Sequence, residues 1–144
     1  MKKPIALLFV LLLVSGSLWS QLSGTYTVGS GGNYATIAAA IDALNTSGVV
    51  APGVTFNVLA GHTESATTTL TITATGTSTA PIVFQKSGTG ANPLITRMDA
   101  GTISTSSLSA DGDAIIKLSG TDYITFNGID LTANNQGIEY GYYT

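Results

Sequence analysis

The feature that most constrains the fold is a series of short apolar segments separated by turn-forming residues. In VTFNV (54–58), apolar and polar residues alternate, which is the period of a strand with one buried face. Between the segments lie clusters rich in Gly, Asn, Pro and Thr, such as ATGTSTAP and KSGTGANP, which favour turns. This pattern predicts an all-β fold. The other predicted strands are LTIT from Leu70, IVFQ from Ile82, LITRM from Leu94, AIIKL from Ala114, YITF from Tyr123 and IDLT from Ile129.

A repeat near the end of the chain favours a solenoid over a sandwich or a barrel. AIIKLSG (114–120) aligns with QGIEYGY (136–142) at an offset of 22, which places Leu118 on Tyr140 and Lys117 on Glu139. A period in the low twenties fits one coil of a parallel β-solenoid, whose equivalent strands lie about 4.8 Å apart. The alignment predicts that Lys117 and Glu139 are neighbours on the outer face. A chance match between two alternating patterns is the alternative.

One amphipathic helix is predicted before the strands, over GGNYATIAAAIDALN (31–45). Asn33 or Thr36 can cap its start, and Gly48 lies beyond its end. The first coil of a solenoid leaves its core and strand edges uncovered, so we predict that the helix covers that end. The alternative is a surface helix on a β-sandwich. The apolar residues at helical spacing are Ile37, Ala40, Ile41 and Leu44.

The composition limits the partners of the chain. Only 9% of the 144 residues are charged, and Thr, Ser, Gly and Asn fill the polar positions. After residue 20, the cations Lys86, Arg97 and Lys117 face eight carboxylates, a net charge of about −5. Nucleic acid is therefore an unsuitable partner, because its phosphates require a basic surface.

The first twenty residues predict export. Lys2 and Lys3 precede an apolar run from Ile5 to Val14, and small residues follow. We interpret residues 1–20 as a cleaved signal peptide and residues 21–144 as the exported domain. An uncleaved anchor is the alternative, but the run is shorter than the roughly 20 residues that span a bilayer. The chain has no cysteine, which excludes a lipid anchor on cysteine and any disulfide.

These residues resemble a known family. YTVGSGGNYATIAAAIDAL with VTFNVLAGHTES is similar to the N-terminal cap and first coil of right-handed parallel β-helix proteins of the pectin lyase-like class, and LSGTDYITFNGIDLTANN is similar to a later coil. The Thr-rich and Ala-rich style is most similar to secreted surface proteins of Bacteroidetes-type bacteria. The class includes lyases, esterases, glycosidases and non-catalytic proteins, so the resemblance implies fold more than function. Enzymes of this type commonly have Gly-x-Tyr-x-Glu, whereas GHTE places Glu64 one residue closer and lacks the tyrosine.

A lyase would need several carboxylates around calcium and a Lys or Arg base. The nearest candidates are Asp111 and Asp113 on the turn ADGDA, with Arg97, Asp99 and Lys117 nearby in the sequence. Calcium takes six to eight oxygen ligands, and Asp-Gly is also common turn chemistry. We therefore assign no metal site and no cofactor.

Hydrolytic residues are equally weakly indicated. Asp122 and Asp130 are candidates for a glycosidase carboxylate pair, but the sequence does not fix their separation. His62, the single histidine, follows Gly61 and lacks a Cys or Ser partner pattern, so we interpret it as a solvated loop residue. The QDT-type string of pectin esterases is absent. No catalytic residue is assigned, and the sequence favours a non-enzymatic role for this chain.

Carbohydrate binding is the competing hypothesis. Tyr140, Tyr142 and Tyr143 could stack on sugars, and rows of Thr and Asn would present hydroxyls and amides along a flat sheet. The alignment with Leu118 favours Tyr140 as a core residue, and Asn134 and Asn135 are typical of a turn. No carbohydrate-binding residue is assigned.

The sequence therefore predicts a right-handed parallel β-helix with an N-terminal capping helix, incomplete at the C-terminus. Thr144 follows the start of a new coil with no cap after it, so we expect further coils of a longer chain as its partner. The predicted role is that of a secreted or cell-surface scaffold or adhesion segment that contacts polysaccharide. The alternative is the first part of a polysaccharide lyase or pectin esterase whose active site lies beyond residue 144.

Overall fold

The computed structural model describes residues 20–98, 113–134, 138 and 140–144. The predicted signal peptide, residues 1–20, lies outside this part except for its last residue. In chain order, the elements are β1 (Leu22–Val28), α1 (Ile37–Ser47), β2 (Val49–Leu59), β3 (Thr63–Ala66), β4 (Leu70–Ile72), β5 (Ile82–Ser87), β6 (Leu94–Arg97), β7 (Ala114–Leu118), β8 (Ile124–Asn127), β9 (Asp130–Ala133) and β10 (Tyr140–Tyr143).

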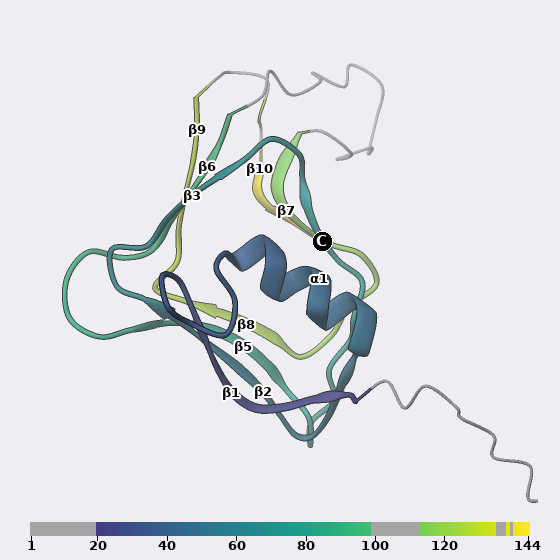
Figure 1. The fold of residues 1–144 in the computed structure, drawn as a ribbon. Coiled ribbons are helices and arrows are strands. Elements are labelled where there is room, and N and C mark those ends of the chain that lie inside the picture. Colours follow the sequence, from purple (N-terminus) through teal and green to yellow (C-terminus); the bar gives the residue numbers. More distant parts are fainter. Residues whose placement is uncertain (1–19, 99–112, 135–137, 139) are drawn as a thin grey trace, which may run out of the picture.

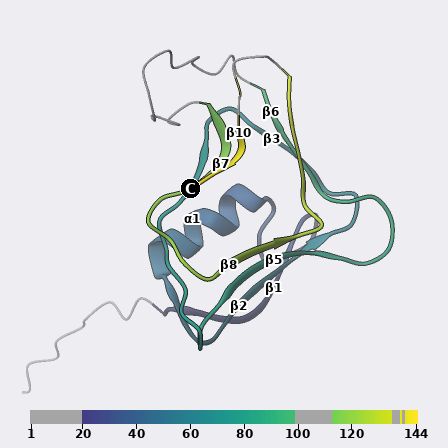
Figure 2. The same ribbon diagram turned by 180° about the vertical axis from the view of Figure 1, so that it is seen from behind.

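The strands form three parallel sheets, in which β2, β3 and β4 are each followed by every third later strand, and β1 is added beside β2. Sheet A has the order β1-β2-β5-β8, sheet B the order β3-β6-β9 and sheet C the order β4-β7-β10. Every pair of neighbouring strands is parallel. Figures 1 and 2 show the three sheets as three sides around α1. The prediction of a parallel β-helix is confirmed, and a sandwich is excluded.

The coils differ in length, and the predicted period is wrong. Val54 pairs with Ile82, 28 positions later, and Ile82 pairs with Ile124, 42 positions later. In sheet C, Lys117 lies beside Tyr143, an offset of 26 instead of 22. Both offsets are even, so both keep the inward and outward positions of an alternating pattern in phase. Lys117 is therefore not in register with Glu139, whose own position lies outside the described residues.

A column of aromatic rings runs through the core along the inner side of sheet A. The rings of Phe56 and Phe84 are stacked with centroids 4.6 Å apart, and those of Phe84 and Phe126 are 5.2 Å apart. Tyr26 and Tyr34 pack against Phe56 at the α1 end. Phe56 and Phe84 have no exposed surface, so this aromatic column is the centre of the core.

Helix α1 covers one end of this core, as predicted. The Thr36 hydroxyl accepts a hydrogen bond from Ala39 N–H at 3.1 Å, and Gly48 ends the helix with a φ of 68°, a conformation that favours glycine. Figure 1 shows α1 lying across the space between the three sheets. The buried residues of the helix are the predicted Ile37, Ala40, Ile41 and Leu44.

Both ends of α1 are attached to the next coil by buried or half-buried polar side chains. The Glu64 carboxylate in β3 accepts hydrogen bonds from Ile37 N–H at 2.6 Å and Ala38 N–H at 2.9 Å. A carboxylate suits this place because the N-terminus of a helix carries a partial positive charge and unpaired N–H groups. At the other end, the Asn45 amide donates to Thr71 O and accepts from Thr73 N–H, both at 2.8 Å.

The opposite end of the core is less well covered. In the described part of the chain, β8, β9 and β10 are the last strands of their sheets. Ile124 and Phe126 are only half-buried, whereas their partners Ile82 and Phe84 in the preceding coil are completely buried. The two ends of the solenoid are therefore unlike each other.

Candidate functional surface

The outer side of sheet A carries two uncharged rows of side chains along the solenoid axis. Because inward and outward positions alternate, the residues flanking the aromatic column point to the outside. The rows cross four strands that lie side by side in Figure 1. We call this surface the amide face. Its first row is Thr25, Thr55, Val83 and Thr125, and its second row is Thr27, Asn57, Gln85 and Asn127.

The amide face offers regularly spaced hydrogen-bonding groups. Neighbouring strands lie about 4.8 Å apart, and the two rows are separated by two residues, or about 6.6 Å. Gln85 Nε2 donates to Asn57 Oδ1 at 2.9 Å, so the second row is partly ordered without a ligand. Such a surface can exchange hydrogen bonds with a neutral polyhydroxyl chain. Thr and Asn fill most of these two rows, as predicted, but Val83 interrupts the first row and Gln85 the second.

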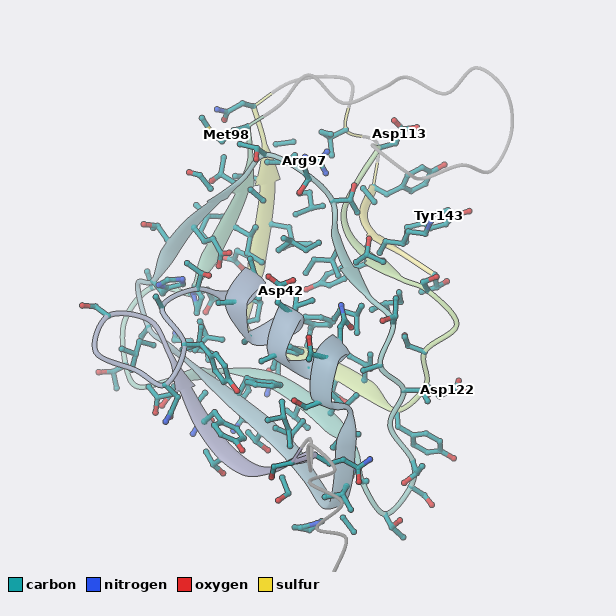
Figure 3. The ribbon with its side chains drawn as sticks, turned by 45° about the vertical axis from the view of Figure 1, so that its right-hand side comes forward. Asp42, Arg97, Met98, Asp113, Asp122 and Tyr143 are labelled. Carbon is teal, nitrogen blue, oxygen red and sulfur yellow. The ribbon has the colours of Figure 1, made fainter. Side chains whose placement is uncertain are left out.

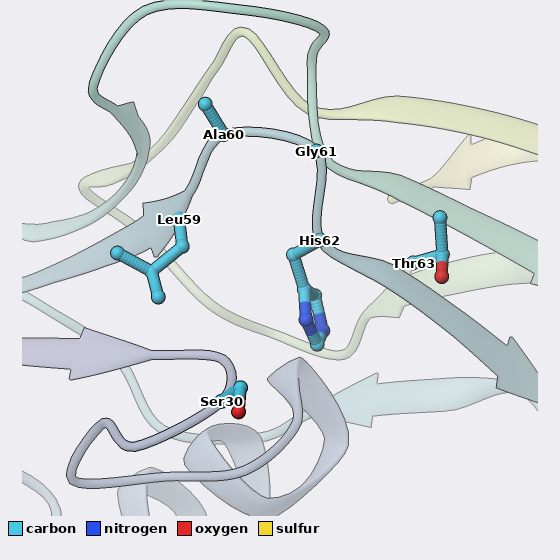
Figure 4. Close-up of a pocket in the computed structure, with 6 residues that line it drawn as sticks. All are labelled: Ser30, Leu59, Ala60, Gly61, His62 and Thr63. Atoms are coloured by element: carbon cyan, nitrogen blue, oxygen red, sulfur yellow. The ribbon is translucent and has the colours of Figure 1, made fainter.

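A second feature is a small pocket of about 330 Å³ at the turn between β2 and β3. Figure 4 shows the His62 ring extending from this turn on the side of the pocket where Ser30 lies. Gly61 has a φ of 77°, which favours a glycine in this turn. The lining residues are Ser30, Leu59, Ala60, Gly61, His62 and Thr63.

The interpretation of His62 as a solvated residue is wrong. Its side chain is only 11% exposed, and its Nε2 lies 3.6 Å from Oε2 of Glu64. The same Glu64 oxygen accepts the hydrogen bond from Ile37 N–H, so this carboxylate primarily fastens α1. His62 therefore packs beside a carboxylate that is hydrogen-bonded to the start of α1.

The corner between sheets B and C contains two of the predicted candidates. Arg97 is buried, and its Nη1 donates to Ala114 O at 2.6 Å and to Thr69 Oγ1 at 2.9 Å. Asp113 is also buried, and Figure 3 shows both residues at the same end of the molecule. The guanidinium thus links β6 to the start of β7. Arg97 acts as a structural cation rather than as an exposed base.

Of the other residues considered for calcium, only Lys117 belongs to the described part of the chain. Lys117 lies on the outer side of sheet C, beside Thr71 and Tyr143. Asp99 and Asp111 lie outside the described residues. Among the residues that are described, no group of three or more His, Cys, Asp or Glu side chains could hold a metal ion.

The two aspartates considered as a glycosidase pair are far apart. Asp122 precedes β8, and Asp130 follows it as the first residue of β9. The intervening strand has four residues, so its two ends lie three rises or about 10 Å apart, and both aspartates lie beyond those ends. Glycosidase carboxylates lie about 5 to 9.5 Å apart. Asp130 instead accepts a hydrogen bond from the Asn92 amide at 3.0 Å.

The tyrosines of β10 lie at the less covered end, in a register that differs from the prediction. Tyr140 pairs with Ala114 instead of Leu118. Tyr142 pairs with the core residue Ile116, and its ring centroid lies 4.9 Å from that of Phe126. Through its pairing with Ala114, Tyr140 keeps the predicted inward position, but on the last described strand of sheet C it is 45% exposed and is not a buried core residue. Of the two asparagines, Asn134 follows β9, and Asn135 lies outside the described residues.

The pKa of Tyr142 is raised to about 12, first because burial disfavours the phenolate and second because Asp130 is negatively charged. Changing Asp130 to Asn should lower this pKa but leave it above the ordinary 10, since the larger cause remains. Because the folded chain holds the Tyr142 proton more tightly than the unfolded chain, its contribution to the free energy of unfolding is complete below pH 10. This contribution is lost as the pH rises through about 12. An NMR titration of the Tyr142 ring checks the prediction, with Asp122→Asn as the control. An unchanged Tyr142 pKa in the Asp130 variant would contradict it.

Comparison with known proteins adds no family to this description. No protein-family model, no curated protein and no solved structure matches the chain. Within residues 20–98 and the later described segments, no helix is long and apolar enough to cross a membrane. The three-sheet fold and the chemistry of its surfaces are therefore the basis on which a function is assigned.

Proposed function

We propose that this chain is a segment of an extracellular β-helix scaffold that adheres to neutral polysaccharide through the amide face. The observation that carries the proposal is the alignment of Asn57, Gln85 and Asn127 in one outward row across three coils. Buried core residues account for the fold, whereas this row stands on the opposite side of the same strands. Amides and hydroxyls both donate and accept hydrogen bonds, as the hydroxyls of a sugar require.

The charge of the chain favours a neutral ligand over a polyuronate. No residue of the amide face is charged, so it cannot form the ion pairs that recognise carboxylates. The whole chain has a formal net charge of −3, which repels polyanions over distances of a Debye length. The basic start and apolar run of residues 2–14 support an extracellular location.

The less covered end supports a scaffold role. In the described part of the chain, β8, β9 and β10 are the last strands of their sheets, and their outer edges have N–H and C=O groups in the spacing that joins the coils. We include in the proposal that further parallel coils pair with these edges. A solenoid extended in this way would repeat the amide face along its axis and bind a long polymer at several places.

Replacing the amide row tests the proposal. The triple variant Asn57→Ala, Gln85→Ala and Asn127→Ala should bind a neutral polysaccharide such as insoluble cellulose or xylan about tenfold more weakly, because several hydrogen bonds are lost. Binding is measured by co-sedimentation, with polygalacturonate beads as the anionic comparison.

A matched control lies on sheet B. Ser65, Thr96 and Thr132 form an outward row of the same register, and their alanine variants should change affinity less than about twofold. Equal losses for the two triple variants, or stronger binding to polygalacturonate than to the neutral polymers, would contradict the proposal.

A further inference from the structure

Tyr123 adopts a backbone conformation that its side chain does not favour. Its φ is 54°, and no other non-glycine residue in the described part of the chain has a positive φ. This left-handed region crowds the Cβ atom, so glycine, asparagine and aspartate normally occupy it. A tyrosine at this position is therefore strained, because its Cβ atom is crowded in this backbone conformation.

The surrounding backbone holds Tyr123 in this conformation. Ile82 N–H donates to Tyr123 O at 2.9 Å, and Gly76 N–H donates to Asp122 O at the same distance. Gly76 approaches so closely that a Cβ at that position would lie 3.1 Å from both Cβ and O of Tyr123. Two segments of the preceding coil therefore fix the chain at this corner.

The folded chain gains little from the Tyr123 ring. The residue is 57% exposed, more than any other large hydrophobic residue described. None of the ring pairs in the described residues includes it. Neither burial nor aromatic contact compensates for the unfavourable backbone, and strained residues of this kind are concentrated at functional sites.

The position of Tyr123 relates it to the amide face. It is the residue directly before β8, and its neighbour in the preceding coil is Pro81, directly before β5. The two rows of the amide face therefore begin two and four residues later along the same strand. Asp122, which precedes Tyr123, lies at an outer corner of the ribbon in Figure 3.

We infer that the Tyr123 ring is a stacking surface for one sugar residue of the polysaccharide bound to the amide face, an inference that rests on the proposed function. A pyranose ring presents C–H groups on its faces and hydroxyls at its rim. The aromatic ring would pack against the face of one sugar, while the amides of Asn57, Gln85 and Asn127, about 13 Å along the strand, would bond hydroxyls of other sugars in the same polymer. The fixed backbone keeps the ring in place before the ligand arrives, which lowers the entropy cost of binding.

Three substitutions of Tyr123 separate binding from folding. Tyr123→Phe retains the aromatic face and should bind cellohexaose or xylohexaose within about twofold of the unchanged chain. Tyr123→Ala and Tyr123→Asn should bind about three- to tenfold more weakly, the loss expected for one aromatic contact. Asparagine tolerates the left-handed backbone, so the melting temperature of Tyr123→Asn should not fall and should rise by up to about 2 to 4 °C. Affinity is measured by isothermal titration calorimetry and melting by calorimetry.

The outcomes distinguish this inference from the proposed function. If the amide-row variant loses affinity and Tyr123→Ala does not, the stacking role fails while the amide face stands. If Tyr123→Ala loses affinity and the amide row does not, the ring binds and the proposed face is wrong. A lower melting temperature for Tyr123→Asn with unchanged affinity would show that the ring serves the fold. If the unchanged chain binds neither oligosaccharide, both are overturned.

Discussion

Changing Phe84 to alanine is expected to lower the free energy of unfolding by about 4 kcal/mol. The side chain has no exposed surface and lies in the middle of the aromatic column. Its ring stacks on Phe56 at 4.6 Å on one side and on Phe126 at 5.2 Å on the other. Truncation removes both ring contacts and leaves a cavity that strands fixed by hydrogen bonds on both sides cannot close. Urea denaturation followed by circular dichroism measures the change.

Two control substitutions test whether the loss of stability comes from the buried aromatic ring. Phe84→Leu keeps most of the volume and should cost about half as much. Val83→Ala changes the adjacent outward residue of the same strand and should cost less than about 1 kcal/mol, because Val83 is only half-buried. If Phe84→Ala were no more destabilising than Val83→Ala, the aromatic column would not be the centre of the core.

Changing Glu64 to alanine is expected to lower the free energy of unfolding by about 3 to 5 kcal/mol. The carboxylate is 8% exposed and accepts hydrogen bonds from two N–H groups of the first turn of α1. Hydrogen bonds to a charged group contribute about 1.5 to 3 kcal/mol each, and the N–H groups would stay buried without an acceptor. The favourable interaction with the helix dipole is lost as well.

Two variants test whether the carboxylate itself is responsible. Glu64→Gln keeps one acceptor oxygen and the same size, so it should cost about half as much as Glu64→Ala. Asp42→Asn removes the exposed carboxylate of α1 itself and should change stability by less than about 0.5 kcal/mol. The same urea titration provides all the values. If Glu64→Ala and Asp42→Asn were equally mild, α1 would be held by its apolar contacts alone.

The strands could be predicted from the sequence because each is a local pattern. In β2 and β5, alternation separates the core residues from the outward ones without knowledge of the neighbouring strand. The register could not be predicted, because it depends on the length of the connections between coils. A shift from 26 to 22 residues keeps every side chain on its side of the sheet, so the pattern of residues 114–118 could not exclude it.

The helix was predictable for the same local reason, but its attachment was not. Ile37, Ile41 and Leu44 reveal the buried face by their spacing. The Glu64 carboxylate accepts a hydrogen bond from Ile37 N–H, 27 positions earlier in the sequence, and no short sequence motif predicts a hydrogen bond over that separation. The burial of His62 follows from this contact and was missed with it. The left-handed conformation of Tyr123 was also missed, because YITF is typical of a strand and does not indicate a positive φ.

In the described part of the chain, a helix closes one end of the core and no element closes the other, which gives the solenoid a direction. Helix α1 and β1 precede all the coils in the chain, and a growing chain emerges in that order. Once Glu64 and Asn45 join the helix to the first complete coil, every later strand meets an edge that is already ordered. Each later coil then needs only to pair its strands with those of the coil before it. Folding can therefore proceed coil by coil during synthesis, and the exposed edge is always that of the most recently added coil.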